Sequence, residues 1–204
     1  MAGFREAYPG KKLGIVWIDA HPDINTPFTS RSGNMHGMPL AIVTGIDNRQ
    51  NQTRNPSQRE CQYWEKFKKL GDNVDASDVV IVGVRDIDPA ERNIIQELGI
   101  KCITPENIKQ HGIEFNANEI TNRLKQCDLI FVSFDVDSLD PSISKGTGTP
   151  AQNGLSLEEA TFLLRKLWQL PNLCGLEITE INPLVDSKNS MAEIVINMLK
   201  YMLS

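Results

Sequence analysis

The chain has 204 residues, a net charge of −5 and 40% hydrophobic residues, which is typical of a globular protein. No long basic run offers the face that neutralises nucleic-acid phosphates. No stretch approaches the roughly 18 apolar residues that a membrane span needs. We therefore expect one domain over residues 1–204, with neither nucleic acid nor membrane as partner. Four scattered cysteines and an opening unlike a signal peptide favour small buried thiols and a cytoplasmic location.

Apolar runs alternate with helical patterns along the chain. Five runs predict strands buried on both faces: Leu13–Ile18, Val79–Val84, Ile100–Ile103, Leu129–Phe134 and Cys174–Ile178. The predicted helices are Gln58–Leu70, Pro89–Leu98, Ala117–Gln126, Leu157–Leu170 and a last one from about Asn189. The polar stretch Thr44–Pro56 predicts an exposed loop. This alternation indicates an α/β fold with a parallel sheet.

Acidic residues gather where three of the predicted strands end. The segments concerned carry Asp19, His21 and Asp23, then Asp135 and Asp137, then Glu180. In an open parallel sheet the carboxyl ends of the strands meet at one edge, where ligands bind. Five like charges placed together there destabilise the fold unless cations neutralise them. Oxygen ligands with one imidazole favour Mn²⁺, with Mg²⁺, Fe²⁺ and Co²⁺ as alternatives, and the number of acids suggests two ions.

Simpler interpretations exist for each motif taken alone. The Asp19–Asp23 segment could equally be a turn whose aspartates cap the next segment. The segment from Asp135 superficially resembles a calcium loop, but Leu139 holds its fifth position and the motif's Gly and Glu are missing. The glycines of Gly146–Pro150 lack the Gly-Lys-Ser/Thr of a phosphate-binding loop, so a turn is the better interpretation.

Five segments together resemble the arginases in order and spacing, from about Gly14 to the C-terminus. They are Asp19–Pro27, Ser32–Gly37, Ser133–Pro141, Gly146–Pro150 and Glu177–Pro183. The resemblance implies a three-layer α/β/α fold with a mostly parallel sheet. It also implies hydrolysis of L-arginine to L-ornithine and urea by a hydroxide held between two Mn²⁺ ions.

The resemblance also implies roles for individual residues. Asp19 and Asp135 would bridge the two ions, Asp23 would serve the first, and His21 and Asp137 would complete the second. We expect His36 to act as proton shuttle or general acid, although a satisfied loop histidine is the simpler alternative. The resemblance also implies that the carboxylate of Glu180 would accept hydrogen bonds from the planar guanidinium group of the substrate. Thr149 would lie beside Glu180.

Substrate choice follows from a second group of residues in the resemblance. Asn25, Ser32 and Asn34 would bind the carboxylate of the amino acid, and Asp88 would bind its α-amine. Agmatine lacks that carboxylate, so a polar site built for it should discriminate against agmatine. Arg31 is unusual in this loop, where arginases typically have small hydroxyl residues, and we expect it to alter entry or affinity.

One feature of the arginases is missing from the sequence. Arginases carry a further metal-binding histidine in a Gly-Gly-Asp-His-Ser segment just upstream of the first strand here. This chain has three histidines, at positions 21, 36 and 111, and His111 lies in a predicted polar linker, where it is a poor substitute. We therefore expect an N-terminally truncated arginase with about five strands, an exposed edge at Gly175–Thr179, a weak first metal site and feeble or no turnover. The alternatives are a related guanidino hydrolase such as an agmatinase, or a non-catalytic subunit; the complete protein is expected to be a homotrimer.

Overall fold

The computed structural model describes residues 2–70, 74–186 and 188–204, and its centre is one parallel sheet. The strands are β1 (Leu13–Ile18), β2 (Val79–Val82), β3 (Lys101–Ile103), β4 (Leu129–Asp135) and β5 (Leu173–Thr179). Their order across the sheet is β3-β2-β1-β4-β5, and every neighbouring pair is parallel. The five predicted strands and the α/β class are confirmed.

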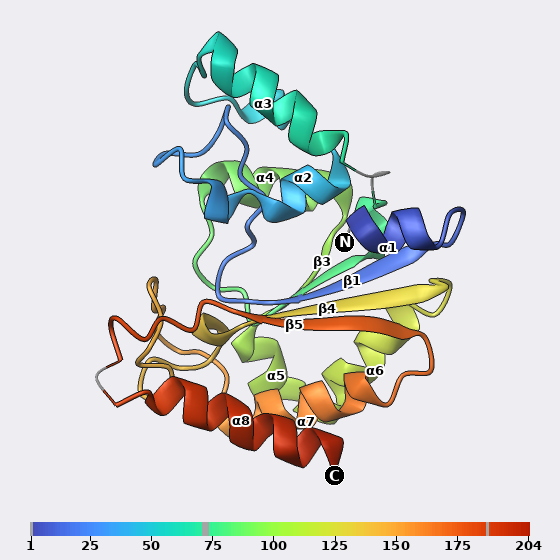
Figure 1. The fold of residues 1–204 in the computed structure, drawn as a ribbon, viewed down its shortest axis with the longest axis vertical. Coiled ribbons are helices and arrows are strands. Elements are labelled where there is room, and N and C mark those ends of the chain that lie inside the picture. The colour runs from blue at the N-terminus through green and yellow to red at the C-terminus, as the bar shows by residue number, and fades with distance from the viewer. Residues whose placement is uncertain (1, 71–73, 187) are drawn as a thin grey trace.

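Helices cover both faces of the sheet, which gives the expected three layers (Figure 1). One face carries α1 (Ala2–Ala7), α2 (Pro39–Thr44), α3 (Gln58–Lys68) and α4 (Pro89–Leu98). The other carries α5 (Pro105–His111), α6 (Ile113–Arg123), α7 (Leu157–Trp168) and α8 (Ser190–Leu203). Side chains alternate along β1, so Ile15 and Trp17 enter one core while Val16 and Ile18 enter the other. Burial on both faces explains why these strands are apolar throughout.

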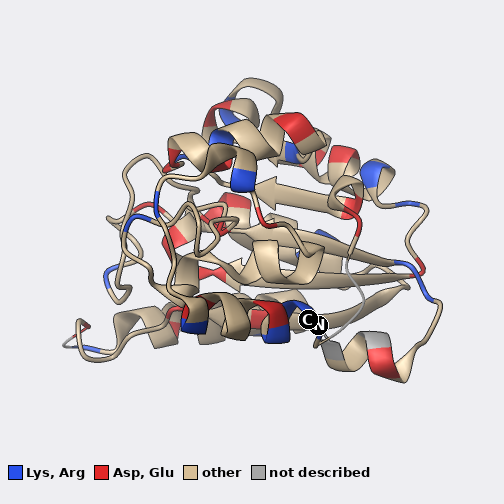
Figure 2. Ribbon diagram, turned by 90° about the horizontal axis from the view of Figure 1, so that it is seen from above, with Lys and Arg blue, Asp and Glu red and all other residues tan. Residues whose placement is uncertain are grey.

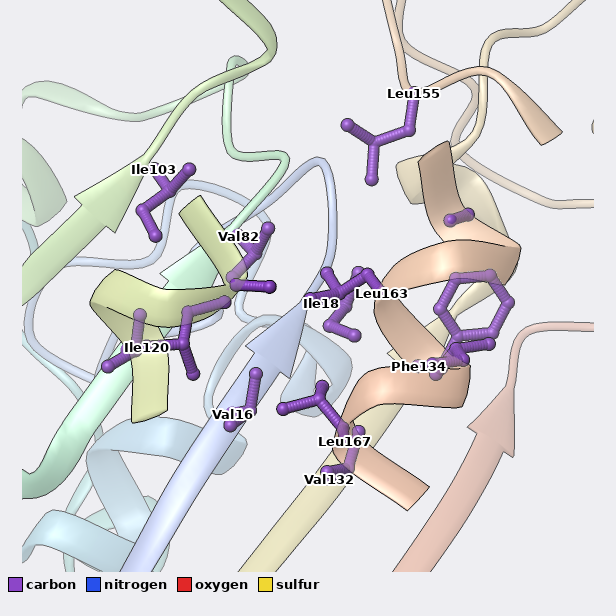
Figure 3. Packing of buried hydrophobic residues seen from close by; sticks show 14 of the residues in the cluster. Val16, Ile18, Val82, Ile103, Ile120, Val132, Phe134, Leu155, Leu163 and Leu167 are labelled. Carbon is purple, nitrogen blue, oxygen red and sulfur yellow. The ribbon is translucent and has the colours of Figure 1, made fainter. Parts of the chain in front are cut away.

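Helix α7 illustrates how the sequence produces this packing. Ser156 caps the helix by accepting a hydrogen bond from the backbone N–H of Glu159, whose side chain accepts one from the N–H of Ser156 in return. Leu163 and Leu167 then lie one turn apart on the buried side, facing the strands (Figure 3). Each buried leucine contributes about 1.5–3 kcal/mol.

Several element boundaries differ from the prediction, and two of the differences occur at glycines with a positive φ. Strand β2 ends at Val82 rather than at residue 84, because Gly83 adopts a φ of 86° and turns the chain away from the sheet. Helix α6 begins at Ile113, four residues before the predicted start, after Gly112 with a φ of 84°. Apolar periodicity alone did not place either boundary.

The interpretation of the segment around His111 as a polar linker was wrong. Residues Pro105–His111 form helix α5, which Thr104 caps together with Asn107 at its third position. His111 is the last residue of that helix, and its ring centroid lies 5.4 Å from the ring of Phe115. It therefore belongs to the junction between α5 and α6.

The stretch Thr44–Pro56 is less exposed than predicted. Asn48 is 2% exposed, adopts a φ of 51° and donates a hydrogen bond to the carbonyl oxygen of Ala90 at 3.0 Å. Asp47 accepts a hydrogen bond from Nε1 of Trp64 at 2.7 Å. The segment thus connects α3 and α4, because Asp47 bonds to a residue of α3 and Asn48 bonds to a residue of α4.

Strand β5 is an edge strand of the sheet, as predicted for Gly175–Thr179. It pairs with β4, and no strand in the described residues pairs with its other side. Phe4 of α1 packs over this region, with its ring centroid 5.7 Å from that of Phe131. Gly175 makes this approach possible, because a Cβ there would lie 2.8 Å from Cζ of Phe4.

The outer helices carry charged residues of both signs, Lys and Arg as well as Asp and Glu (Figure 2). Among the described helices, none has both the length and the apolar character needed to cross a bilayer. The four cysteines are free thiols, of which Cys127 is buried as predicted and the other three are half-buried.

Candidate metal centre and substrate cavity

The predicted metal ligands follow the ends of the two central strands β1 and β4. Asp19 comes directly after β1, Asp135 is the last residue of β4, and Asp137 lies in the short 3₁₀ turn Val136–Ser138. The backbone N–H of Ala20 donates to Oδ1 of Asp137 at 3.1 Å, which joins the two loops. The N–H of Asp137 donates in turn to Oδ1 of Asp135 at 2.8 Å. These contacts hold the carboxylates in fixed positions at the carboxyl edge of the sheet.

Asp19, His21 and Asp137 form one compact group. A ligand atom from each lies within 4.8 Å of the others. Nδ1 of His21 is 3.1 Å from Oδ2 of Asp137 and 3.4 Å from Oδ1 of Asp19. Two carboxylates and one imidazole are the donors that Mn²⁺ and related divalent cations accept. The group therefore fits a metal ion by both chemistry and spacing.

The protonation of this group reflects its burial. Asp19 is 2% exposed, and burial raises its pKa to about 6 even though a hydrogen bond from His21 opposes the shift. For His21, burial disfavours the charged form, but hydrogen bonds to Asp137 and Asp19 raise its pKa to about 11. In the metal-free protein, a proton on His21 thus supplies the positive charge that the two carboxylates require. A divalent cation can replace that proton.

Asp23 and Asp135 lie outside the 4.8 Å group but interact with it electrostatically. Burial, followed by the charge of Asp19, raises the pKa of Asp23 to about 9. The same two causes raise the pKa of Asp135 to about 8. Asp135 also accepts a hydrogen bond from Oγ1 of Thr179 at 3.3 Å. These pKa values indicate an excess of buried carboxylate that additional cations would relieve.

A cavity of about 270 Å³ opens beside the group. Its walls contain eight of the residues predicted from the sequence: His21, Asp23, Asn25, Ser32, Asn34, His36, Asp88 and Thr149. His36 lies in the exposed 3₁₀ turn Met35–Gly37. Of the expected metal ligands, His21 and Asp23 border this space together with the expected substrate residues, whereas Asp19, Asp135, Asp137 and Glu180 are not part of its lining. The space can hold a small polar molecule.

Thr149 and Glu180 lie on the β4–β5 side of this region. Oγ1 of Thr149 donates a hydrogen bond to Oδ2 of Asp137 at 3.1 Å. Glu180 follows β5 with a φ of 61°, and its Oε2 would lie 3.9 Å from a Cβ built on Gly148. The carboxylate of Glu180 is exposed, and its charge is among the causes that raise the pKa of Asp135.

Arg85 is a site residue that the sequence did not reveal. Its guanidinium donates hydrogen bonds to six backbone carbonyl oxygens: those of Gly83, Asp137, Ser138, Leu139, Ala151 and Gln152. It thereby joins the loop after β2 to the loop that carries Asp137. No pattern in the sequence signals contacts to backbone carbonyls, so only the folded chain could show them.

Glu91 and Ser30 were also missed. Glu91 is 4% exposed and lines the cavity; its two carboxylate oxygens accept hydrogen bonds from the N–H groups of Ile24 and Asp88. Burial raises its pKa to about 7. The capping-box spacing from Asp88 to Glu91 was a signal that could have identified it. Ser30, in contrast, is one of several hydroxyl residues in its loop, and nothing in the pattern distinguishes it.

Comparison with known proteins places this arrangement in a family. The model of the Arginase family matches residues 1–204. An arginase of Neurospora crassa is 35% identical over 182 residues, which cover 89% of this chain and 48% of the relative. An arginase of Staphylococcus aureus is 37% identical over 190 residues, covering 92% of this chain and 58% of the relative.

Solved structures agree with the sequence comparison. The crystal structure of Entamoeba histolytica arginase in complex with L-ornithine superposes with a TM-score of 0.86 and 32% identity. The match covers 100% of this chain and 64% of that one. The chain thus spans between about half and two thirds of the length of these relatives.

Proposed function

This chain belongs to the arginase family, and we propose that the protein hydrolyses the guanidinium group of L-arginine to give L-ornithine and urea. The observation that carries the proposal is that the Asp19–His21–Asp137 group reaches a polar cavity through His21, which lines it. The names of its relatives support the choice of arginine. The metal ligands lie beside a cavity whose lining contains both positively and negatively charged side chains. Such a cavity suits a small zwitterionic substrate.

We assign the metal ligands as the five residues expected from the sequence: Asp19, His21, Asp23, Asp135 and Asp137. Their oxygen-rich donor set favours Mn²⁺. These residues would hold two such cations, which would neutralise the carboxylates and would supply a water of near-neutral pKa. The raised pKa values of Asp19, Asp23 and Asp135 support the proposal, because they indicate that these carboxylates require cations for full ionisation.

The chain's other residues bind the substrate and move protons. His36 borders the cavity from an exposed turn, where its imidazole can donate a proton to the leaving amine and exchange it with solvent. Glu180 pairs with the guanidinium through its carboxylate. Thr149 holds Asp137 through its hydroxyl and narrows the site beside Glu180.

A second group of residues in the cavity lining recognises the amino-acid end of the substrate. Asn25, Ser32 and Asn34 lie there and offer donors for the carboxylate. Asp88 offers an acceptor for the α-amine, and Nδ2 of Asn25 holds one of its oxygens at 3.2 Å. A substrate without the carboxylate leaves these donors unpaired, so the site should prefer L-arginine to agmatine.

Urea release from L-arginine and from agmatine by the purified chain with Mn²⁺ tests this proposal. We expect slow, Mn²⁺-dependent release from arginine, because the described residues bring only one imidazole to the ligand group. Faster release from agmatine would favour a different guanidino hydrolase. No release from either, with co-purification of a longer arginase, would favour a non-catalytic subunit. The homotrimer was expected of the complete protein, and light scattering of that protein tests it.

A further inference from the structure

A cation and an anion lie side by side at the mouth of the cavity. Nε of Arg31 is 3.6 Å from Oδ1 of Asp88, and both residues line the cavity. The other oxygen of Asp88 accepts the hydrogen bond from Asn25, so the carboxylate is oriented. The Arg31 side chain is 74% exposed against 34% for Asp88. Arg31 is therefore the more accessible member of the pair.

This ion pair is weak enough to exchange partners. Its separation exceeds that of a hydrogen bond, and exposed pairs of this kind contribute about 0–1 kcal/mol. The guanidinium fork matches a carboxylate through two parallel hydrogen bonds. A ligand carboxylate that reaches Arg31 can therefore replace Asp88 at little cost.

We propose that Arg31 determines specificity by binding the substrate carboxylate, while Asp88 binds the adjacent ammonium. This inference rests on the proposed function, in which an α-amino acid end occupies this wall. The two side chains present opposite charges next to each other, and an α-amino acid presents the complementary charges on one carbon. Binding of the head group thus breaks the weak pair between Arg31 and Asp88 and forms two ion pairs with the ligand.

Ligands with only half of the head group gain less from the same exchange. A ligand amine without a carboxylate takes Asp88 and leaves Arg31 without an anion. A ligand carboxylate without an amine takes Arg31 and leaves Asp88 without a cation. Selectivity for the complete head group follows, because only the zwitterion keeps both residues paired.

Equilibrium binding of three ligands that contain no guanidinium tests the inference without turnover. The ligands are L-ornithine, putrescine, which lacks the carboxylate, and 5-aminopentanoate, which lacks the α-amine. Each is titrated into the 204-residue chain with Mn²⁺ and followed by isothermal titration calorimetry. The variants are Arg31→Gln, Arg31→Lys and the control Arg59→Gln, which removes an exposed arginine of α3 away from the cavity.

We expect Arg31→Gln to reduce the selectivity for ornithine over putrescine about fivefold, the size of an exposed ion pair. It should also weaken 5-aminopentanoate binding, while Arg31→Lys retains part of the selectivity and Arg59→Gln retains all of it. Unchanged or increased selectivity in Arg31→Gln overturns the role of Arg31 but leaves the proposed function standing. If the wild-type chain binds none of the three ligands, the proposed function and this inference both fail.

Discussion

Nη2 of Arg85 donates a hydrogen bond to the backbone carbonyl oxygen of Asp137 at 2.8 Å. The same guanidinium donates to the carbonyl oxygens of Gly83 and Ala151, each at 2.8 Å. One side chain thus holds the loop after β2 to two parts of the connection between β4 and α7. Residues that orient metal ligands in this way commonly affect metal affinity as much as stability.

The first prediction concerns this contact. Arg85→Met should weaken Mn²⁺ binding by about tenfold or more, because the Asp137 loop loses its anchor. Arg123→Met provides a matched control, since Arg123 also donates to backbone carbonyls, those of Ser77 and Gly99. Isothermal titration with Mn²⁺ separates the two. Equal metal affinity in both variants would show that Arg85 serves stability alone.

The second prediction concerns pH. In the metal-free protein, the pKa values of Asp23 and Asp135 are raised to about 9 and about 8, and that of His21 to about 11. The folded state therefore holds protons that the unfolded chain releases, so stability falls as pH rises from about 5 to 9. The slope is on the order of 1 kcal/mol per pH unit.

Thermal unfolding between pH 5 and pH 9, with EDTA or with Mn²⁺, checks this prediction. Cations displace these protons, so the stabilisation by Mn²⁺ should grow with pH over the same range. A metal-free melting temperature that rises toward pH 9 contradicts the assigned pKa shifts.

The third prediction concerns metal stoichiometry. The Asp19–His21–Asp137 group supplies three ligands at close spacing, whereas Asp23 and Asp135 lie outside it. We expect one Mn²⁺ to bind at least about tenfold more tightly than a second, since each ligand in a metal site contributes strongly to affinity. Electron paramagnetic resonance of free Mn²⁺ during a titration measures both steps. Asp137→Asn should abolish the binding step of higher affinity. Two sites of equal Mn²⁺ affinity in the wild type would contradict the prediction.

The fourth prediction concerns the edge of the sheet. Gly175→Ala places a methyl group 2.8 Å from Cζ of Phe4 and 3.0 Å from the ring of Phe131. Such overpacking costs about 1–3 kcal/mol, so the melting temperature should fall. Gly3→Ala is the control, because a Cβ at Gly3 meets no atom within 4 Å. Adding Phe4→Leu to Gly175→Ala should recover part of the loss, and no recovery would place the strain elsewhere.

The sequence predicted the sheet well because buried parallel strands such as Leu13–Ile18 are apolar on both faces. It also placed the acids after those strands, and the structure brings Asp19, His21 and Asp137 together. Helix α5 was missed because its seven residues carry little apolar periodicity. Arg85 was missed because its partners are backbone carbonyls of loops distant in sequence, which no sequence spacing encodes. For Glu91, the capping-box spacing from Asp88 was a signal, but the contact with the N–H of Ile24 was not encoded in any spacing.

Urea release from L-arginine by the Mn²⁺-loaded chain, compared with Asp137→Asn, tests the central claim most directly. Asp137 belongs to the group of three ligands and joins the loops after β1 and β4. We predict slow release from arginine by the wild type and loss of that release in Asp137→Asn or with EDTA. Absence of urea from the wild-type reaction, or a rate that neither Asp137→Asn nor EDTA reduces, would contradict the proposed metal-dependent hydrolysis.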